Sequence, residues 1–260
     1  TIARFARRND HTKVLCQIDN VEPHEHHLTD KPFNRYYLGV VDGFVYMSEQ
    51  VHGELKAYSD APALFSPHPL FENFGERVAR NEACVRLGLI RDYKGLDLLL
   101  DAWAGLRRRG LAAGRRLIVA GEFYTPKERY LRQIADNGLQ DEVILHDRFI
   151  PDEQVKYYFS AVDFVVQPYK TATQSGVTQI AYQFCVPMVV TDVGGLSEIV
   201  PDGRVGYVCE PTVQGVADAI ARMYDGDTIE RFRLNCIEER KRFSWEEMCT
   251  RIAELYEMVR

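Results

Sequence analysis

Two features of this 260-residue chain have the residue types and spacing to bind an anion. One is a pair of basic residues, and the other is a serine followed by a glycine. Arg91 and Lys94 stand three positions apart at a predicted strand-to-helix turn, so both cations can reach one anion at the start of that helix. Ser175 and Gly176 open another predicted helix, whose unpaired N–H groups and dipole favour phosphate. Taken singly, each feature has an ordinary explanation. The two cations can be a surface charge pair, and the glycine can simply permit a tight turn.

A third turn strengthens the anion-binding interpretation. Gly121 directly follows an apolar run, residues 116–120, that is typical of a strand. A further crossover comes after the helix that Ser175 opens, because residues 187–190 form a second apolar run and Gly194 follows it. In a parallel sheet these turns lie at the carboxyl edge, where open α/β folds bind ligands. We therefore expect one ligand site at that edge.

The elements that position these turns alternate between strand and helix periodicity. The predicted strands cover residues 12–18, 43–47, 116–120, 143–145, 163–168, 187–190 and 206–209. The predicted helices cover residues 33–40, 49–56, 96–109, 127–137, 153–161, 176–184, 213–224, 228–242 and 248–259. The expected N-cap residues are Ser48, Asp152, Thr212 and Ser244. This alternation predicts an α/β fold with parallel sheets.

A stretch rich in prolines and aromatics, residues 61–75, breaks the periodicity and is interpreted as a domain boundary. The chain would then contain an N-terminal part over residues 1–72 and a second domain over 73–243. Residues 244–260 would form a closing helix that crosses back to the first domain.

The sequence before Ile90 is too short for the elements expected there. Residues 80–89 must serve both as a helix and as the strand that should precede the turn at Arg91, which one short segment cannot do. We expect a strand and turn of about ten residues to be missing at this point, by normal element lengths. The start at Thr1, without Met, also suggests an incomplete chain.

Composition places the chain among ordinary globular proteins. Its net charge of −6 argues against a dedicated nucleic-acid binder, and 46% hydrophobic residues suffice for a core. The basic clusters Arg107–Arg109 and Arg115–Arg116 are interpreted as a solvated face, with contact to anionic lipid as the alternative. The six cysteines lack CxxC spacing, which favours reduced thiols and a cytoplasmic protein. No apolar run reaches the length of a membrane span, about 18 residues.

A polar loop after the first strand carries three histidines, His24, His26 and His27. Neighbouring ligands cannot all face one metal ion, and the spacing matches no HExxH motif. A polar active-site loop or a surface loop is therefore the preferred interpretation.

Several segments together resemble a known family. IRDYKGLDLLLDAW, RLIVAGE, DEVILHDRFIPDEQVKYYFSAVDFVVQPY and CVPMVVTDVGGLSEIVPDGRVGYV are similar to the C-terminal nucleotide-sugar-binding domain of GT-B glycosyltransferases of family 4. The resemblance covers residues 89–224, and DNVEPHE and VDGFVYMSEQV resemble the end of that family's N-terminal domain. It implies two Rossmann-like domains facing across a cleft, the first of them incomplete here. It also implies metal-independent sugar transfer from a nucleoside diphosphate, usually with retention of anomeric configuration.

The resemblance also implies roles for individual residues. Arg91 and Lys94 resemble the family's diphosphate-binding cations, which stabilise the charge on the departing nucleotide. Asp19 and His24 fall where the family places polar groups near the transferred sugar, and His24 would bond a hydroxyl or assist a proton transfer unless it is only a satisfied loop histidine. The implied donor-binding residues are Gly121, Glu122, Phe149, Ile150, Gln174, Ser175, Gly176, Val177, Thr178 and Gln179, with Phe149 and Ile150 beside the nucleobase.

The chain departs from the family at two glutamates that usually contact the donor sugar and the ribose. Counting back from Pro187, those positions hold Ala172 and Ile180, neither of which can accept a hydrogen bond through its side chain. Gln174 and Gln179 lie close enough in sequence to substitute, because a neutral amide still binds hydroxyls. Because of this departure, the resemblance alone fixes neither the identity of the donor sugar nor the catalytic activity.

The sequence therefore predicts a cytoplasmic enzyme, with peripheral membrane association as an option, that moves a hexose-type sugar from a nucleotide donor to a glycan or lipid-linked acceptor. The donor is a substrate, and neither a cofactor nor a metal nor a nucleic-acid partner is expected. Two alternatives stay open. One is a nucleotide-sugar epimerase of the same architecture, and the other is a non-catalytic nucleotide-sugar-binding module, which the two missing glutamates favour.

Overall fold

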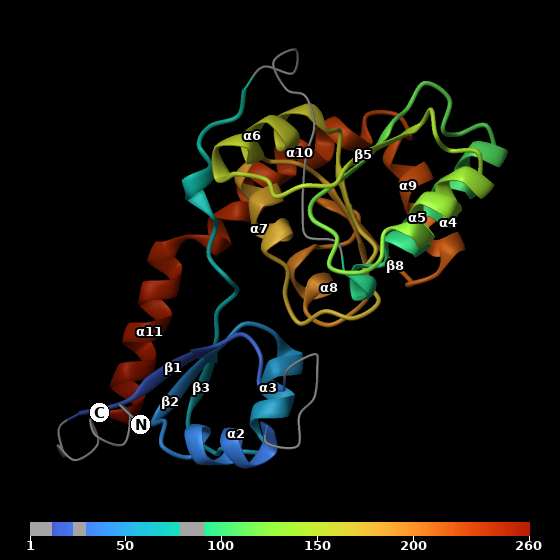
Figure 1. The fold of residues 1–260 in the computed structure, drawn as a ribbon. Coiled ribbons are helices and arrows are strands. Elements are labelled where there is room, and N and C mark those ends of the chain that lie inside the picture. Colours follow the sequence, from blue (N-terminus) through green and yellow to red (C-terminus); the bar gives the residue numbers. More distant parts are fainter. Residues whose placement is uncertain (1–11, 23–29, 79–90) are drawn as a thin grey trace. The chain divides into compact units, whose positions relative to one another are not determined.

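The computed structural model describes residues 12–22, 30–78 and 91–260, which belong to two compact units (Figure 1). The first unit is formed by Thr1–Pro69 together with Arg242–Arg260, and the second by Leu70–Lys241. His24 and the segment before Ile90 that is too short for its expected elements lie outside the described residues.

The first unit is built on a three-stranded parallel sheet in the order β1-β2-β3. Its strands are β1 (Leu15–Ile18), β2 (Gly43–Tyr46) and β3 (Ala63–Phe65). Its helices are α2 (Asp30–Leu38), α3 (Glu49–Leu55) and α11 (Trp245–Val259). Every residue of the central strand β2 is buried, because helices cover both of its faces.

The two faces of this sheet have separate cores. Phe44 and Tyr46 of β2 pack with residues of α2 and α3, whereas Val45 packs with Met248 and Leu255 of α11. Gly43 allows this close approach, since a Cβ at that position would lie 3.0 Å from the Cδ1 atom of Leu255. The closing helix of the chain is thus part of the first unit (Figure 1).

The second unit contains two parallel sheets. One pairs β4 (Leu117–Ala120) with β5 (Val143–His146), and the other has the order β6-β7-β8, with β6 (Val165–Gln167), β7 (Met188–Thr191) and β8 (Gly206–Cys209). Its helices are α4 (Leu96–Arg108), α5 (Glu128–Asp136), α6 (Asp152–Ala161), α7 (Gly176–Gln183), α8 (Leu196–Ile199), α9 (Val213–Met223) and α10 (Thr228–Glu239). Short 3-10 helices cover Glu72–Phe74, Asp92–Lys94 and Arg240–Phe243.

A single core cluster joins these two sheets on one face. Leu99 and Trp103 of α4 pack together with β4 and with Val216 and Ile220 of α9, and Val166 of β6 packs against the same cluster. Because α9 also packs on β7 and β8, the two sheets share one hydrophobic layer. The predicted α/β fold with parallel sheets is therefore confirmed.

Three predicted helix starts were wrong, and one of them is the start of α11, which begins at Trp245 instead of residue 248. The helix expected from residue 33 begins at Asp30, because Pro32 is tolerated in the first turn, where its missing N–H has no helical partner. Asp152 is the first residue of α6, and the N-cap position belongs to Pro151. The caps at Ser48, Thr212 and Ser244 are confirmed, each accepting a hydrogen bond from a backbone N–H three residues ahead.

Candidate functional site

The turn that carries Arg91 and Lys94 is a short 3-10 helix, Asp92–Lys94, that leads into α4. Lys94 is directed toward an aromatic ring, with its Nζ atom 5.6 Å from the centre of the Tyr169 ring. The guanidinium of Arg91 lies 5.0 Å from the centre of the Tyr124 ring. Aromatic faces attract cations without neutralising them, so both positive charges remain available to an anion.

Gly95 fixes this turn against the end of β6. Its backbone is left-handed, with φ at +67°, and a Cβ there would lie 1.9 Å from the carbonyl oxygen of Pro168. The N–H of Lys170 donates to the carbonyl of Tyr93 at 2.7 Å, which joins the same two segments a second time. Only glycine combines this conformation with this approach, so the position of Lys94 depends on it.

The start of α7 has no side-chain cap among the described residues. Ser175 holds the N-cap position in extended conformation, yet its hydroxyl makes no capping hydrogen bond. Instead its Oγ lies 3.2 Å from the Oη of Tyr169, and both side chains are buried. The first N–H groups of α7 are therefore left to a ligand or to water, which is the arrangement of an anion site.

Tyr169 connects these two features. Its ring contacts Lys94 and its hydroxyl contacts Ser175, while Lys94, Tyr169 and Val177 all line one pocket. Burial raises the pKa of Tyr169 to about 12, so its hydroxyl keeps its proton at neutral pH. The sequence assigns no role to Tyr169, whose only signal is its place directly after the predicted strand that ends at Pro168.

The electrostatics of Lys94 suit an anionic ligand. Burial lowers the pKa of its ammonium group, and the nearby charge of Arg91 lowers it further. A bound anion would replace the lost hydration and offset the repulsion between the two cations. The site is therefore prepared for negative charge.

Four further predicted donor residues lie on loops of the same unit. Gly121 ends β4 with φ at +139° and donates its N–H to the carbonyl of His146 at 2.9 Å. Glu122 is half-buried beside Tyr124, which also contacts Arg91. On the loop after β5, Phe149 is 62% exposed, and its neighbour Ile150 packs against Ala120 and Tyr158.

The two positions where the sequence resemblance would place glutamates are apolar and buried in this structure. Ala172 and Ile180 are 5% and 9% exposed. On the same helix as Ile180, Gln179 is 1% exposed, and among the described residues neither its amide oxygen nor its amide nitrogen has a hydrogen-bond partner. Thr178 is satisfied, since its hydroxyl donates to the Oε1 atom of Gln167 at 3.2 Å. Gln179 is thus the buried amide of α7 that still has hydrogen-bonding capacity.

The predicted acceptor-side residue, Asp19, and the predicted catalytic histidine, His24, belong to the first unit. Asp19 is exposed and directly follows β1. His24 lies outside the described residues.

Comparison with known proteins identifies the family. A family model described as glycosyl transferases group 1 matches residues 82–226, which is more than half of the chain. The chain belongs to this family. Among curated members, the D-inositol 3-phosphate glycosyltransferase of Pseudarthrobacter chlorophenolicus is 32% identical over 140 residues, covering 53% of this chain and 33% of that protein. The glycogen synthase of Thermus thermophilus is 28% identical over 197 residues, covering 71% of this chain and 41% of that protein.

Solved structures of other proteins have the same fold. HepE from Anabaena in complex with UDP gives a TM-score of 0.77 at 17% identity, covering 99% of this chain and 74% of that chain. Sucrose-phosphate synthase from Thermosynechococcus elongatus gives a TM-score of 0.75 at 18% identity, covering 99% of this chain and 70% of that chain. The predicted GT-B fold is therefore confirmed. The chain spans only about a third to two fifths of the length of the curated relatives it matches.

Proposed function

We propose that this chain is the donor-binding part of a glycosyltransferase that moves a sugar from a nucleoside diphosphate to a glycan or lipid-linked acceptor. The observation that carries the proposal is the uncapped start of α7 next to Lys94, with Tyr169 holding the Ser175 hydroxyl away from the helix N–H groups. A fixed cation and a helix N-terminus together form a diphosphate site.

The chemistry follows from where charge develops during transfer. When the bond between the sugar and the diphosphate breaks, negative charge accumulates on the leaving oxygen. Lys94, Arg91 and the N–H groups at the start of α7 would stabilise that charge more strongly in the transition state than in the ground state, which lowers the barrier. In this proposal these groups supply the charge compensation without a metal ion, and the sugar keeps its anomeric configuration.

The sugar and the base would meet the other predicted residues. Gln179 offers a buried amide that can both donate to and accept from a sugar hydroxyl. The exposed loop with Phe149 and Ile150 would meet the nucleobase, and Gly121 and Glu122 would complete the donor site. Asp19 stays assigned to the acceptor-side cleft, and His24 stays assigned to catalysis beside the transferred sugar.

A non-catalytic nucleotide-sugar-binding module is the second candidate. The observation that favours it is the apolar character of Ala172 and Ile180, which leaves the helix and loop without the two carboxylates. Such a module would bind the donor with the same cations but release it unchanged.

Product analysis separates the two functions. The protein is incubated with UDP, GDP and ADP conjugates of radiolabelled glucose, with and without a mixture of glycan and lipid-linked acceptors. Transfer of label to an acceptor, lost in Lys94→Met, supports the transferase. Donor binding with no labelled product under any condition would instead support the binding module. Conversion of the donor to an epimer without acceptor would contradict both.

The cellular setting is part of the same proposal. We propose a cytoplasmic protein, and the five described cysteines, which are free thiols, support this location. No helix in that part of the chain has the length and apolar character needed to span a membrane.

A further inference from the structure

Thr191 is the polar residue at the end of β7, a strand whose other members are apolar. All residues of this strand are buried, and Thr191 is 0% exposed. A buried hydroxyl is stable only when it has a hydrogen-bond partner. The Oγ1 atom of Thr191 lies 2.6 Å from the carbonyl oxygen of Tyr169 and 3.4 Å from that of Gln167. Both partners belong to the segment that leads from β6 into the donor site.

This hydroxyl replaces a backbone donor that the sheet does not supply. Strands β6 and β7 run parallel, with Gln167 opposite Val190. One further step of this ladder would bring the N–H of Val193 to the carbonyl of Tyr169. The chain turns before that step, because the N–H of Val193 donates to the carbonyl of Thr191 at 2.9 Å. The carbonyl of Tyr169 therefore accepts from the Thr191 side chain instead.

The hydrogen bond from Thr191 fixes one peptide group. The carbonyl of Tyr169 and the N–H of Lys170 belong to the same planar unit, so they cannot turn independently. The carbonyl end accepts from Thr191, and the N–H end donates to the carbonyl of Tyr93 at 2.7 Å. Tyr93 lies in the 3-10 turn directly before Lys94. This peptide group thus connects β7 to the turn that carries Lys94.

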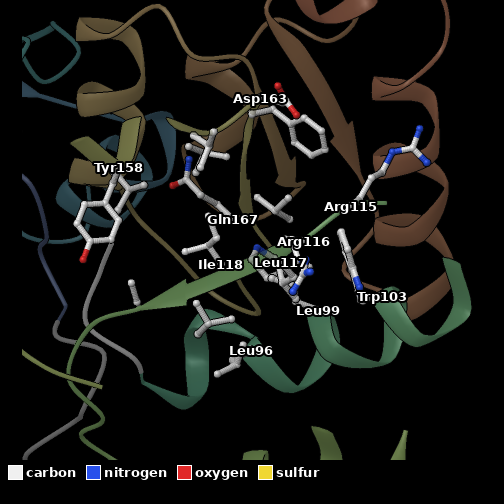
Figure 2. Close-up of a pocket in the computed structure, with 18 of the residues that line it drawn as sticks. Leu96, Leu99, Trp103, Arg115, Arg116, Leu117, Ile118, Tyr158, Asp163 and Gln167 are labelled. Atoms are coloured by element: carbon white, nitrogen blue, oxygen red, sulfur yellow. The ribbon is translucent and has the colours of Figure 1, made fainter. Parts of the chain in front are cut away.

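The side chain of Tyr169 extends the same connection to the start of α7. Its ring contacts Lys94, and its hydroxyl lies 3.2 Å from the hydroxyl of Ser175. Figure 2 shows Gln167, the last residue of β6, in the wall of the pocket that Lys94 and Tyr169 also line. A rotation of the peptide group after Tyr169 would therefore disturb its contacts with both the cation and the helix start.

We propose that Thr191 is a positioning residue of the donor site. Its hydroxyl sets the orientation of the peptide group between Tyr169 and Lys170, and this orientation fixes the places of Lys94 and of the Ser175 hydroxyl. Thr191 itself contacts no ligand in this arrangement. The inference rests on the proposed function, because it concerns the same site, and it adds a group on β7, a strand in which the sequence predicts no donor-site residue.

The first measurement needs neither a variant nor a ligand. Amide hydrogen exchange of the whole chain is followed residue by residue by NMR. Lys170 lies outside the strands, but its N–H belongs to a peptide group that is held at both ends. We therefore expect its exchange rate to lie within about tenfold of that of Val165, whose N–H pairs with Pro187 on the β7 side at 2.9 Å. Much faster exchange of Lys170 in the parent chain would overturn the proposal.

The second measurement compares two substitutions of Thr191. Thr191→Val keeps the shape of the side chain and removes the hydroxyl, so the Lys170 amide should exchange at least about tenfold faster while Val165 stays unchanged. Thr191→Ser keeps the hydroxyl and should retain slow exchange at Lys170. An unchanged Lys170 rate in the folded valine variant, or an equal increase at Val165, would overturn the proposal. Fast exchange of Lys170 in the serine variant would do the same, whether or not the valine variant folds.

Nucleotide affinity then connects Thr191 to the donor site. UDP, GDP and ADP are titrated by calorimetry into the parent chain and into Thr191→Val and Thr191→Ser. We expect the affinity for the nucleotide that binds to fall at least about fivefold in the valine variant and to be retained in the serine variant. Thr228→Val is the matched control, because Thr228 is also buried and its hydroxyl accepts a hydrogen bond from Arg231 on α10. Its affinity should equal that of the parent chain.

The results separate this inference from the proposed function. A folded parent chain that binds none of the three nucleotides contradicts the proposed function, and the donor-site role of Thr191 with it. Nucleotide binding that Thr191→Val leaves unchanged, or that Thr228→Val weakens equally, overturns the role of Thr191 alone.

Discussion

The hydroxyl of Tyr169 lies 3.2 Å from the hydroxyl of Ser175, and this contact decides what the start of α7 can bind. A serine at the N-cap position ordinarily accepts a hydrogen bond from the helix backbone. Here the side chain makes no such bond, so the helix N–H groups keep their capacity for an anion.

Replacing Tyr169 by phenylalanine should therefore weaken anion binding. Without its partner, the Ser175 hydroxyl is free to cap α7 and to compete with a ligand for the same N–H groups. A serine cap contributes about 1 kcal/mol, so we expect an affinity loss of about fivefold for a nucleoside diphosphate. The measurement is isothermal titration calorimetry with UDP.

Tyr182→Phe is the matched control for this loss. Tyr182 lies on the same helix and donates its hydroxyl to the carbonyl of Ile199 at 2.6 Å, so its variant also loses a buried hydrogen bond. It does not release Ser175. Equal losses of affinity in both variants would show that general destabilisation, and not capping, is responsible.

Gly95 should be intolerant of a side chain. Gly95→Ala combines a left-handed backbone with a Cβ 1.9 Å from the carbonyl oxygen of Pro168, and we expect it to lower the free energy of unfolding by about 3 kcal/mol. Gly110 has a similar φ of +73° but open space around its Cβ position, so Gly110→Ala should cost only about 1 kcal/mol. Urea denaturation of both variants measures the difference, and equal costs would contradict the close approach.

Cys185 is the one non-glycine residue with positive φ among those described, at 51°, and it follows Phe184, the C-cap residue of α7. Glycine is preferred at this position after a helix, because an L side chain in the left-handed region costs about 1–2 kcal/mol. Cys185→Ala keeps this strain, and Cys185→Gly removes it at a smaller cost in chain entropy. We therefore expect the glycine variant to be more stable than the alanine variant by about 1 kcal/mol. Thermal denaturation measures the difference, and a more stable alanine variant would contradict the assigned strain.

As the pH rises, anion binding should be lost at a lower pH than it would be with a lysine of ordinary pKa. Burial and the charge of Arg91 lower the pKa of Lys94, so the folded protein loses this positive charge earlier as the pH rises. Arg91→Gln removes the second cause, and the alkaline loss of binding should then shift to higher pH even though binding is weaker throughout. Sulfate is a suitable probe because it does not titrate in this range. An unchanged pH profile in Arg91→Gln would contradict the coupling.

The sequence predicted the elements of the second unit closely, because each is a strongly periodic segment between clear turn residues. The expected strands at residues 116–120 and 206–209 appear as β4 and β8, and Thr212 caps α9 by accepting from the N–H of Gly215 at 3.0 Å. Sequence reasoning was less accurate at helix starts. Pro32 was not recognised as a residue of the first helical turn, and Asp152 was mistaken for a cap.

The site could be predicted only in part. Arg91, Lys94 and Ser175 stand out because strand-to-helix turns carry recognisable charges and small residues. The role of Tyr169 depends on a loop that returns to both Lys94 and α7, and such a contact has no sequence periodicity.

The most direct test of the central claim is calorimetric titration of the whole chain with UDP, GDP and ADP, using Lys94→Met and Lys241→Met as a pair. Both variants remove one lysine charge, but Lys241 lies far along the sequence and pairs with Glu238 on the surface. We predict that one nucleotide binds selectively and that Lys94→Met weakens it at least tenfold, or about 1.4 kcal/mol, while Lys241→Met leaves it unchanged. The account would be contradicted if the folded Lys94→Met protein bound the nucleotide as tightly as the parent chain does. It would also be contradicted if the folded parent chain bound none of the three nucleotides.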